Sequence, residues 1–260
     1  MKKIFAFAAM AATLVSFASC NKGGEENGGK GGDETFVKEY RITSLDGNEF
    51  KYDAQGRVIY YGNEEESREF TYNGTKLTII NNYKGDKTTE YTATLDAAGH
   101  AIEIKTTEHT WANTFDKNGY LVKVVKDGVE RTNQTIEDGN IMAWGRWDAA
   151  NNFWRQKKAS YLDKKNLGGV QTHWDEDADM KRWMWEAGFM GNTSVNVLES
   201  CRWWDFGDEP APKTAVYEYE YDANGCITKE TKYYGVWNET DLTGLDFDDE
   251  HTFTFEKIKK

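Results

Sequence analysis

Proline, cysteine and positive charge are all scarce in this sequence. Its 260 residues include only two prolines and three cysteines, and the formal net charge is -12. So few prolines leave room for long uninterrupted strands, and so few cysteines exclude a disulfide-rich scaffold. The negative charge argues against nucleic acid as a partner, because that binding depends on Lys and Arg side chains that neutralise phosphates.

Recognisable catalytic motifs are missing too. The four histidines do not follow a metal-binding spacing such as H-E-x-x-H, and the sequence has neither a G-x-S-x-G elbow nor a Walker-type glycine loop. We therefore predict no catalytic residues, no metal and no cofactor. A glycoside hydrolase stays an alternative, because 44 acidic residues make some suitably spaced carboxylate pair almost certain.

The apolar run near the N-terminus, residues 4–15, is shorter than the roughly 20 residues that span a bilayer as a helix. Two lysines precede it, and small residues lead into Cys20, so we predict a signal peptide over residues 1–19. The segment before Cys20 resembles the lipobox of bacterial lipoproteins, with Phe17 where leucine is usual. That resemblance implies acylation of Cys20, for example by palmitate, and a lipid anchor in the outer membrane. An ordinary secretory signal is the alternative.

Residues 20–35 are predicted to be a flexible tether. The stretch NKGGEENGGKGGDE has no apolar residue, so it cannot bury enough surface to offset its ordering entropy. Lys22 followed by Glu25 and Glu26 resembles the charged signal that sends some Gram-negative lipoproteins to the cell surface. The rest of the chain, residues 36–260, is predicted to be a single β-rich domain.

Turn signals recur at an even spacing along this domain. Asp53, Asn73, Asp96, Asp116 and Asp138 each precede a glycine, and the successive gaps are 20, 23, 20 and 22 residues. Such spacing indicates a repeated unit, and two short strands with two turns fit one period. In D-x-x-G the aspartate caps backbone amides and the glycine accepts a positive φ, so these aspartates are predicted to form turns and not catalytic sites.

Between the turns, apolar and polar residues alternate with a period of two. Tyr217, Tyr219 and Tyr221 fall on one face of a predicted strand, with Glu218 and Glu220 on the other. One buried and one solvated face is typical of antiparallel sheets. We predict an all-β, antiparallel hairpin meander that forms a soluble barrel-like or half-barrel sheet with one short helical insertion.

The stretches YDAQGRV (52–58) and YDANG (221–225) resemble YD-type repeats. The order of a predicted signal peptide, a tether and a β-rich domain also resembles a family of bacterial lipoproteins catalogued as a domain of unknown function with a porin-like fold. The resemblance extends over about residues 36–257 and includes the blocks YLDKKN (161–166) and GFMGNTSVNVL (188–198). It implies a barrel-like fold and assigns no catalytic residue.

A tryptophan-rich insertion is predicted at about residues 144–206. Eight of the ten tryptophans lie in this stretch, and four of the eight arginines are next to one of them. Two interpretations stay open: the indoles and guanidinium groups pack inside the barrel, or they form an exposed ligand surface. The candidate ligand-binding residues are Arg146, Trp147, Arg202, Trp203 and Trp204.

The acidic stretch around residues 175–186 has two readings. Asp175, Asp177, Asp179 and Glu186 match acidic positions of a calcium loop, but Met180 occupies the place of the required glycine. A short helix over about 175–188 explains the same residues better, with acids in its first turn and one apolar face.

Cys201 and Cys226 remain after the lipid-anchored cysteine, and either a disulfide or two free buried thiols fits them. The function we expect is that of a non-catalytic outer-membrane lipoprotein that binds a glycan or another extracellular ligand. A structural or accessory subunit of a cell-envelope complex is the alternative. The expected partners are outer-membrane lipid and a glycan or envelope protein.

Overall fold

The chain forms a closed antiparallel β-barrel of sixteen strands in the computed structural model, and the compact unit Thr35–Lys260 contains the whole barrel. The structure describes residues 38–148, 150, 152–171, 181–203, 213–236 and 244–259. Residues 1–37 lie outside these ranges, so the signal peptide, the acylation of Cys20 and the tether stay predictions.

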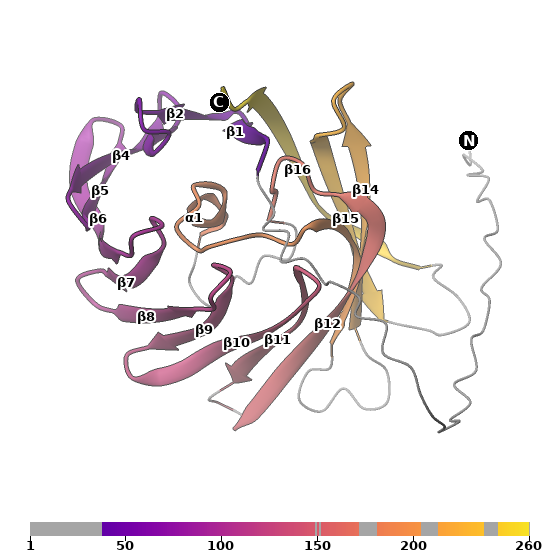
Figure 1. The fold of residues 1–260 in the computed structure, drawn as a ribbon. Coiled ribbons are helices and arrows are strands. Elements are labelled where there is room, and N and C mark those ends of the chain that lie inside the picture. The colour runs from indigo at the N-terminus through magenta and orange to yellow at the C-terminus, as the bar shows by residue number, and fades with distance from the viewer. Residues whose placement is uncertain are drawn as a thin grey trace, which may run out of the picture. The chain divides into compact units, whose positions relative to one another are not determined.

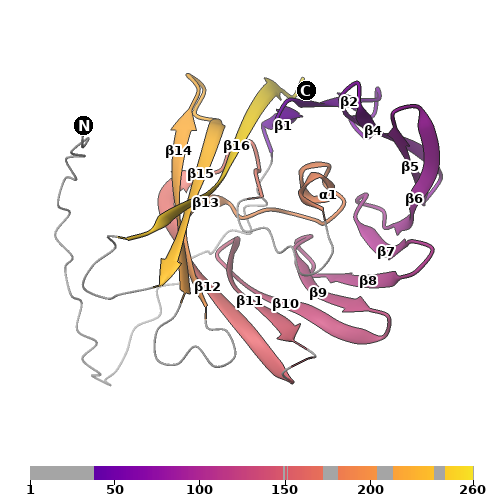
Figure 2. The same cartoon turned by 180° about the vertical axis from the view of Figure 1, so that it is seen from behind.

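Each strand pairs with the next one along the chain, and β1 pairs with β16 to close the ring (Figure 1, Figure 2). The strands are β1 Tyr40–Leu45, β2 Asn48–Tyr52, β3 Val58–Gly62, β4 Glu66–Asn73, β5 Lys76–Tyr83, β6 Asp86–Leu95, β7 Ala101–Lys105, β8 Thr110–Phe115, β9 Leu121–Lys126, β10 Val129–Glu137, β11 Asn140–Asp148, β12 Phe153–Lys165, β13 Asn196–Trp203, β14 Lys213–Tyr221, β15 Ile227–Val236 and β16 Asp246–Lys257. The barrel-like prediction is confirmed, and the half-barrel alternative is wrong because the ring closes.

The predicted turns connect the strands. Asp53 Oδ1 accepts hydrogen bonds from the amides of Gln55 and Arg57, both at 2.9 Å, and Gly56 has a φ of +78°. The same pair of amide bonds is made by Asp96, Asp116 and Asp222. The D-x-x-G aspartates therefore build turns, as the spacing predicted.

Around β5 the inner face of the barrel is apolar and the outer face is polar. On β5, Leu77 and Ile79 are 1% and 2% exposed and belong to the main core. Glu69 and Lys87, in contrast, form an exposed ion pair at 2.7 Å. A membrane-spanning barrel has the opposite arrangement, with an apolar band outside and polar residues inside.

A helical segment fills part of the interior. The helix α1, Arg182–Glu186, lies inside the ring of strands (Figure 1), and all five of its residues are buried. Trp183, Met184 and Trp185, with Phe189 and Met190 just after the helix, join the core formed by the N-terminal strands. In the part of the chain that the structure describes, no helix is long and apolar enough to cross a membrane. The helix begins at Arg182 after an extended Lys181 and has no acid in its first turn, so it is shorter than the helix predicted over 175–188 and lacks the predicted acidic first turn. Residues 172–180 lie outside the described ranges.

Candidate functional site

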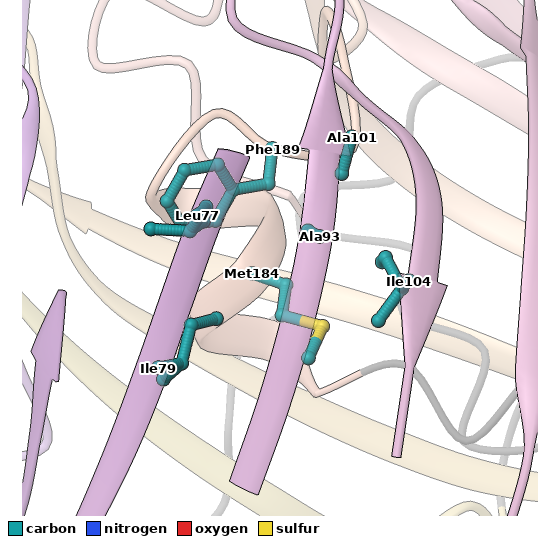
Figure 3. Close-up of a pocket in the computed structure, with 7 residues that line it drawn as sticks. All are labelled: Leu77, Ile79, Ala93, Ala101, Ile104, Met184 and Phe189. Atoms are coloured by element: carbon teal, nitrogen blue, oxygen red, sulfur yellow. The ribbon is translucent and has the colours of Figure 1, made fainter. Parts of the chain in front are cut away.

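The helix α1, which we call the plug because it lies inside the ring of strands, packs tightly against the barrel wall. The Trp183 indole lies 5.7 Å from the Phe70 ring and 6.0 Å from the Tyr61 ring, and the Arg68 guanidinium lies 5.3 Å from it. The cavity beside α1, of about 10 Å³, is lined only by apolar side chains such as Met184 (Figure 3). A cavity of this size is close to the smallest that holds one water molecule, so it is too small for an organic ligand.

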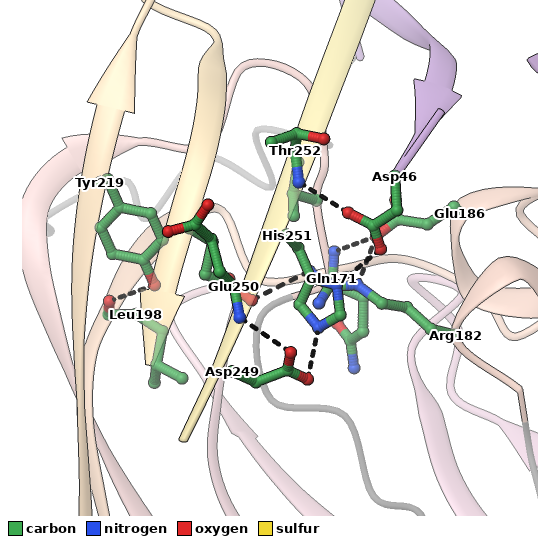
Figure 4. Close-up of polar contacts among 12 residues, drawn as sticks. Asp46, Gln171, Arg182, Glu186, Leu198, Tyr219, Asp249, Glu250, His251 and Thr252 are labelled. Carbon is green, nitrogen blue, oxygen red and sulfur yellow. Dashed lines mark hydrogen bonds and ion pairs between the residues drawn. The ribbon is translucent and has the colours of Figure 1, made fainter. Parts of the chain in front are cut away.

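A group of buried charges joins α1 to the opposite wall. Arg182 Nη2 lies 3.1 Å from Glu230 Oε1 on β15. Arg182 Nε lies 3.6 Å from Glu186 Oε1 (Figure 4). The backbone amide of Gln171 donates to Glu186 Oε1 at 3.1 Å. The Glu186 and Glu230 side chains are 0% and 3% exposed, so this cluster is inaccessible to substrate and serves to hold the plug.

Burial dominates the acid–base properties of these carboxyl groups. It raises the pKa of Glu230 and of Glu186, and the positive charge of Arg182 opposes that rise in both. Raised carboxyl pKa values are typical of acid catalysts, but a catalyst must also contact its substrate. Within the described ranges, no group of three or more His, Cys, Asp or Glu residues could hold a metal ion.

A second polar network borders this cluster where β1 meets β16. His251 Nδ1 lies 2.7 Å from Asp46 Oδ2, and His251 Nε2 lies 3.0 Å from Asp249 Oδ2 (Figure 4). Asp46 Oδ1 also accepts the amide hydrogen of Thr252 at 2.7 Å. The network connects the first and last strands of the barrel and so stabilises its closure.

The predicted Trp-Arg surface is divided between two faces of the barrel wall. Neighbouring residues in a strand point to opposite faces, so Arg146 and Trp147 on β11 separate, as do Arg202 and Trp203 on β13. Trp203 is 8% exposed and belongs to an interior cluster, whereas Arg202 is exposed. Arg146 and Trp203 therefore face inward, and Trp147 and Arg202 face outward. Trp204 lies outside the described ranges.

The outward residues form a surface that we call the outer patch: Trp147, Trp154, Lys158 and Arg202. Trp147 opposes Trp154 across β11 and β12, with ring centroids 5.6 Å apart and planes at 51°. Lys158 opposes Arg202 across β12 and β13. A Cβ atom at Gly145 would lie 3.2 Å from the Trp154 ring, so this glycine lets the indole approach the sheet closely. Both indoles are partly exposed.

The inward residues form a surface that we call the inner wall: Trp144, Arg146, Arg155, Lys157 and Trp203. Lys157 opposes Trp144 on one side and Trp203 on the other, and its Nζ lies 5.6 Å and 5.1 Å from their ring centroids. Arg146 opposes Arg155. The adjacent pair Trp154 and Arg155 was part of the Trp-Arg pattern in the sequence but not of the candidate ligand-binding residues, and Lys157 was missed, because only the strand register shows which residues are cross-strand neighbours.

The two remaining cysteines are free thiols. Cys201 is 3% exposed and Cys226 is 0% exposed, and no disulfide joins them. Burial raises the pKa of the Cys201 thiol, and it raises the pKa of Cys226 to about 11. Of the two alternatives that the sequence left open, the structure has the free buried thiols, and the disulfide is absent.

Glu186 also has a role that excludes the calcium-loop interpretation for this residue, because its carboxylate is paired with Arg182 inside the barrel. Asp175, Asp177 and Asp179 lie outside the described ranges.

Comparison with known proteins supports the fold alone. No protein-family model matches the chain, and no curated protein sequence matches it. The fold is similar to the crystal structure of a porin-like protein from Bacteroides uniformis ATCC 8492, with a TM-score of 0.60 and 16% sequence identity. The match covers 80% of this chain and 90% of that protein.

Proposed function

We propose that this chain is a non-catalytic binding protein of the cell envelope, tethered to the outer membrane through acylated Cys20, and that its outer patch binds a glycan. The observation that carries the proposal is the partly exposed Trp147–Trp154 pair, whose ring centroids are 5.6 Å apart. The predicted signal peptide, and the similarity of the fold to a porin-like protein, support an outer-membrane location.

The chemistry of the outer patch suits a sugar. Flat aromatic faces pack against the apolar faces of pyranose rings, and a few polar groups fix the orientation of the ligand. Lys158, four residues beyond Trp154 on β12, and Arg202 opposite it on β13 supply donors on the same face as the indole pair. The ligand-binding side chains project from strands of a closed barrel, so they are held by a rigid scaffold.

The filled interior opposes a channel function for the N-terminal half of the barrel. Trp183, Met184 and Phe189 are buried among the side chains of that half, where a pore would need water-filled space. The same packing also favours the second candidate, a structural or accessory subunit whose barrel is only a rigid body.

A glycan array tests the proposal. Wild-type protein should bind at least one class of glycan, and the double variant Trp147→Ala/Trp154→Ala should bind it about ten-fold or more weakly, because centrally placed aromatic residues dominate such interfaces. Tyr83→Ala is a matched control, since Tyr83 is a 50% exposed aromatic residue on a distant strand. Absence of binding to every glycan would reject the proposal and favour the structural role.

The anchor needs a separate test. Cys20→Ala should abolish labelling by a radioactive fatty acid and release the protein from membranes. Membrane retention without any lipid label would show that the tether is not an acyl chain.

A further inference from the structure

Glu186 and Glu230, which we call the carboxyl pair, share a single cation inside the barrel. Arg182 Nη2 lies 3.1 Å from Glu230 Oε1, and Arg182 Nε lies 3.6 Å from Glu186 Oε1. In the described part of the chain no second cation lies within ion-pair distance of either carboxyl group. Two ionised carboxyl groups on one guanidinium would bury a net negative charge, which is strongly unfavourable.

The other cations near the carboxyl pair do not supply the missing charge. Lys38, just before β1, acts on Glu186 only beyond ion-pair distance, and burial disfavours its charged form and lowers its pKa. Both ring nitrogens of His251 contact aspartates of the network that joins β1 to β16. Lys232 on β15 pairs with Asp248 at 2.6 Å. Each of these groups is therefore committed elsewhere or is itself disfavoured as a cation.

The remaining titratable groups that face the carboxyl pair and Arg182 add negative charge or none. Asp46, in the turn between β1 and β2, acts on Arg182 through its charge, and its own pKa is lowered, so it is an anion. Three tyrosines also face the carboxyl pair, and burial raises the pKa of each, so they stay neutral: Tyr52, Tyr61 and Tyr217. The second buried carboxyl group thus has no cation of its own.

Unpaired acceptor atoms lie around the same groups. Oε2 of Glu186 and Oε2 of Glu230 are buried and have no hydrogen-bond partner among the described residues. Gln171, which is 1% exposed, donates its backbone amide to Glu186 Oε1 at 3.1 Å (Figure 4). Its side-chain Oε1 is another buried acceptor without a partner in the described ranges. An ionised carboxyl group only accepts hydrogen bonds, whereas a protonated one also donates, so a proton on Glu186 supplies a donor beside Gln171.

We propose that the carboxyl pair holds one proton in the folded barrel, which the unfolded chain releases to water, and that this proton stabilises the position of the plug. Glu186 is the main carrier, because it lies 3.6 Å from Arg182 whereas Glu230 lies 3.1 Å away. With the proton bound, Arg182 and Glu230 form a neutral ion pair beside a neutral Glu186. When the proton leaves at higher pH, two carboxylates repel each other and α1 is held less firmly. This device is independent of any glycan bound at the outer patch.

The direction of the pH dependence follows from burial. Burial raises the pKa of Glu186 and of Glu230, and Arg182 opposes the rise without cancelling it. Below the unfolded glutamate pKa of about 4.3 both states hold the proton, so the ionisation adds no penalty. Above that value the unfolded chain loses the proton first, and folding becomes less favourable until the folded pair also titrates.

Urea unfolding at a series of pH values tests the shared proton, with Glu186→Gln as the variant that needs none. The ratio of the folding equilibrium constant of wild type to that of Glu186→Gln should fall as the pH rises above about 4.3, approaching ten-fold for each pH unit. Glu69→Gln is the matched control, because the Glu69 side chain is 47% exposed, and its ratio should change less than about two-fold. A ratio for Glu186→Gln that does not depend on pH would overturn the proposal.

Infrared spectroscopy detects the proton in wild type and does not require any variant to fold. One carboxylic acid C=O band should remain after the exposed carboxyl groups have ionised, and it should disappear as the pH is raised further. Ionisation of every carboxyl group in one step would overturn the shared proton.

Hydrogen exchange followed by mass spectrometry tests the effect on the plug. Protection factors for residues 183–190 should fall in wild type as the carboxylic acid band disappears, because α1 opens more often. Protection of β5 should stay constant, and so should that of residues 183–190 in Glu186→Gln. Unchanged protection of the plug while the band disappears would show that the proton does not stabilise it.

Discussion

Arg182 of the plug helix and Glu230 of β15 form an ion pair inside the barrel, with Nη2 and Oε1 3.1 Å apart. Their side chains are 9% and 3% exposed, so the pair is desolvated. Arg182 also lies beside Glu186 of its own helix, and one guanidinium group therefore offsets two buried carboxylates. The pair fixes the position of α1 relative to the wall.

Removal of Arg182 should therefore destabilise the fold strongly. Arg182→Met keeps much of the side-chain volume but leaves Glu186 and Glu230 without their shared partner, and we expect the free energy of unfolding to fall by about 3–5 kcal/mol. Urea denaturation followed by tryptophan fluorescence measures the change. Lys87→Met is the control, because it breaks an exposed pair with Glu69 and should cost less than about 1 kcal/mol. Similar losses in both variants would contradict a special role for Arg182.

A glycine after the plug should be equally intolerant of substitution. Gly191 has a φ of +88°, and a Cβ atom there would overlap the carbonyl oxygen of Gly119 in the turn between β8 and β9. Gly191→Ala thus combines backbone strain of about 1–2 kcal/mol with overpacking of about 1–3 kcal/mol. Gly85→Ala shares the positive φ but faces open space, so it isolates the strain alone. Equal unfolding free energies for the two variants would show that the plug moves aside easily.

Much of the barrel could be predicted from local sequence patterns. The alternation with a period of two and the D-x-x-G spacing depend on single strands and turns, so Asp53 and its equivalents were assigned correctly as turn formers. Closure of the ring depends instead on the pairing of β1 with β16, between residues such as Ile42 and Phe255. No local pattern reports that pairing.

The candidate sites were harder to predict because they depend on register. Adjacency in sequence suggested that Arg202 and Trp203 act together, but in a strand adjacency places them on opposite faces. The residue that lies between two tryptophans is Lys157, on a different strand from both of them. Glu230 was missed for a similar reason: its partner Arg182 is far away in the sequence and comes from the plug.

Acid should weaken the contact between the first and last strands. Burial by itself raises the pKa of Asp46, but hydrogen bonds from His251 and from the Thr252 amide outweigh it, so that the pKa is lowered overall. A lowered pKa in the folded state stabilises the fold above the unfolded aspartate pKa of about 3.9, and this contribution is lost as the pH falls through the folded value.

Asp46→Asn should remove that contribution. The variant should melt at a lower temperature than wild type at pH 7, and the two melting temperatures should converge as the pH is lowered below about 4. Thermal unfolding followed by circular dichroism between neutral and strongly acidic pH gives both curves. A constant difference at every pH would mean that Asp46 contributes through its shape and not through its charge.

The two buried thiols give a direct test of the cysteine assignment. In the protein from residue 35 onward, Cys201 and Cys226 are the remaining cysteines, and both are free and buried. Burial raises the pKa of Cys201, and it raises that of Cys226 to about 11, so neither forms much reactive thiolate near neutral pH. A thiol reagent should therefore modify no cysteine in the folded protein, and should modify both in guanidinium without any reductant. If neither cysteine reacts in the denatured protein until a reductant is added, the two are joined by a disulfide and the assignment is wrong.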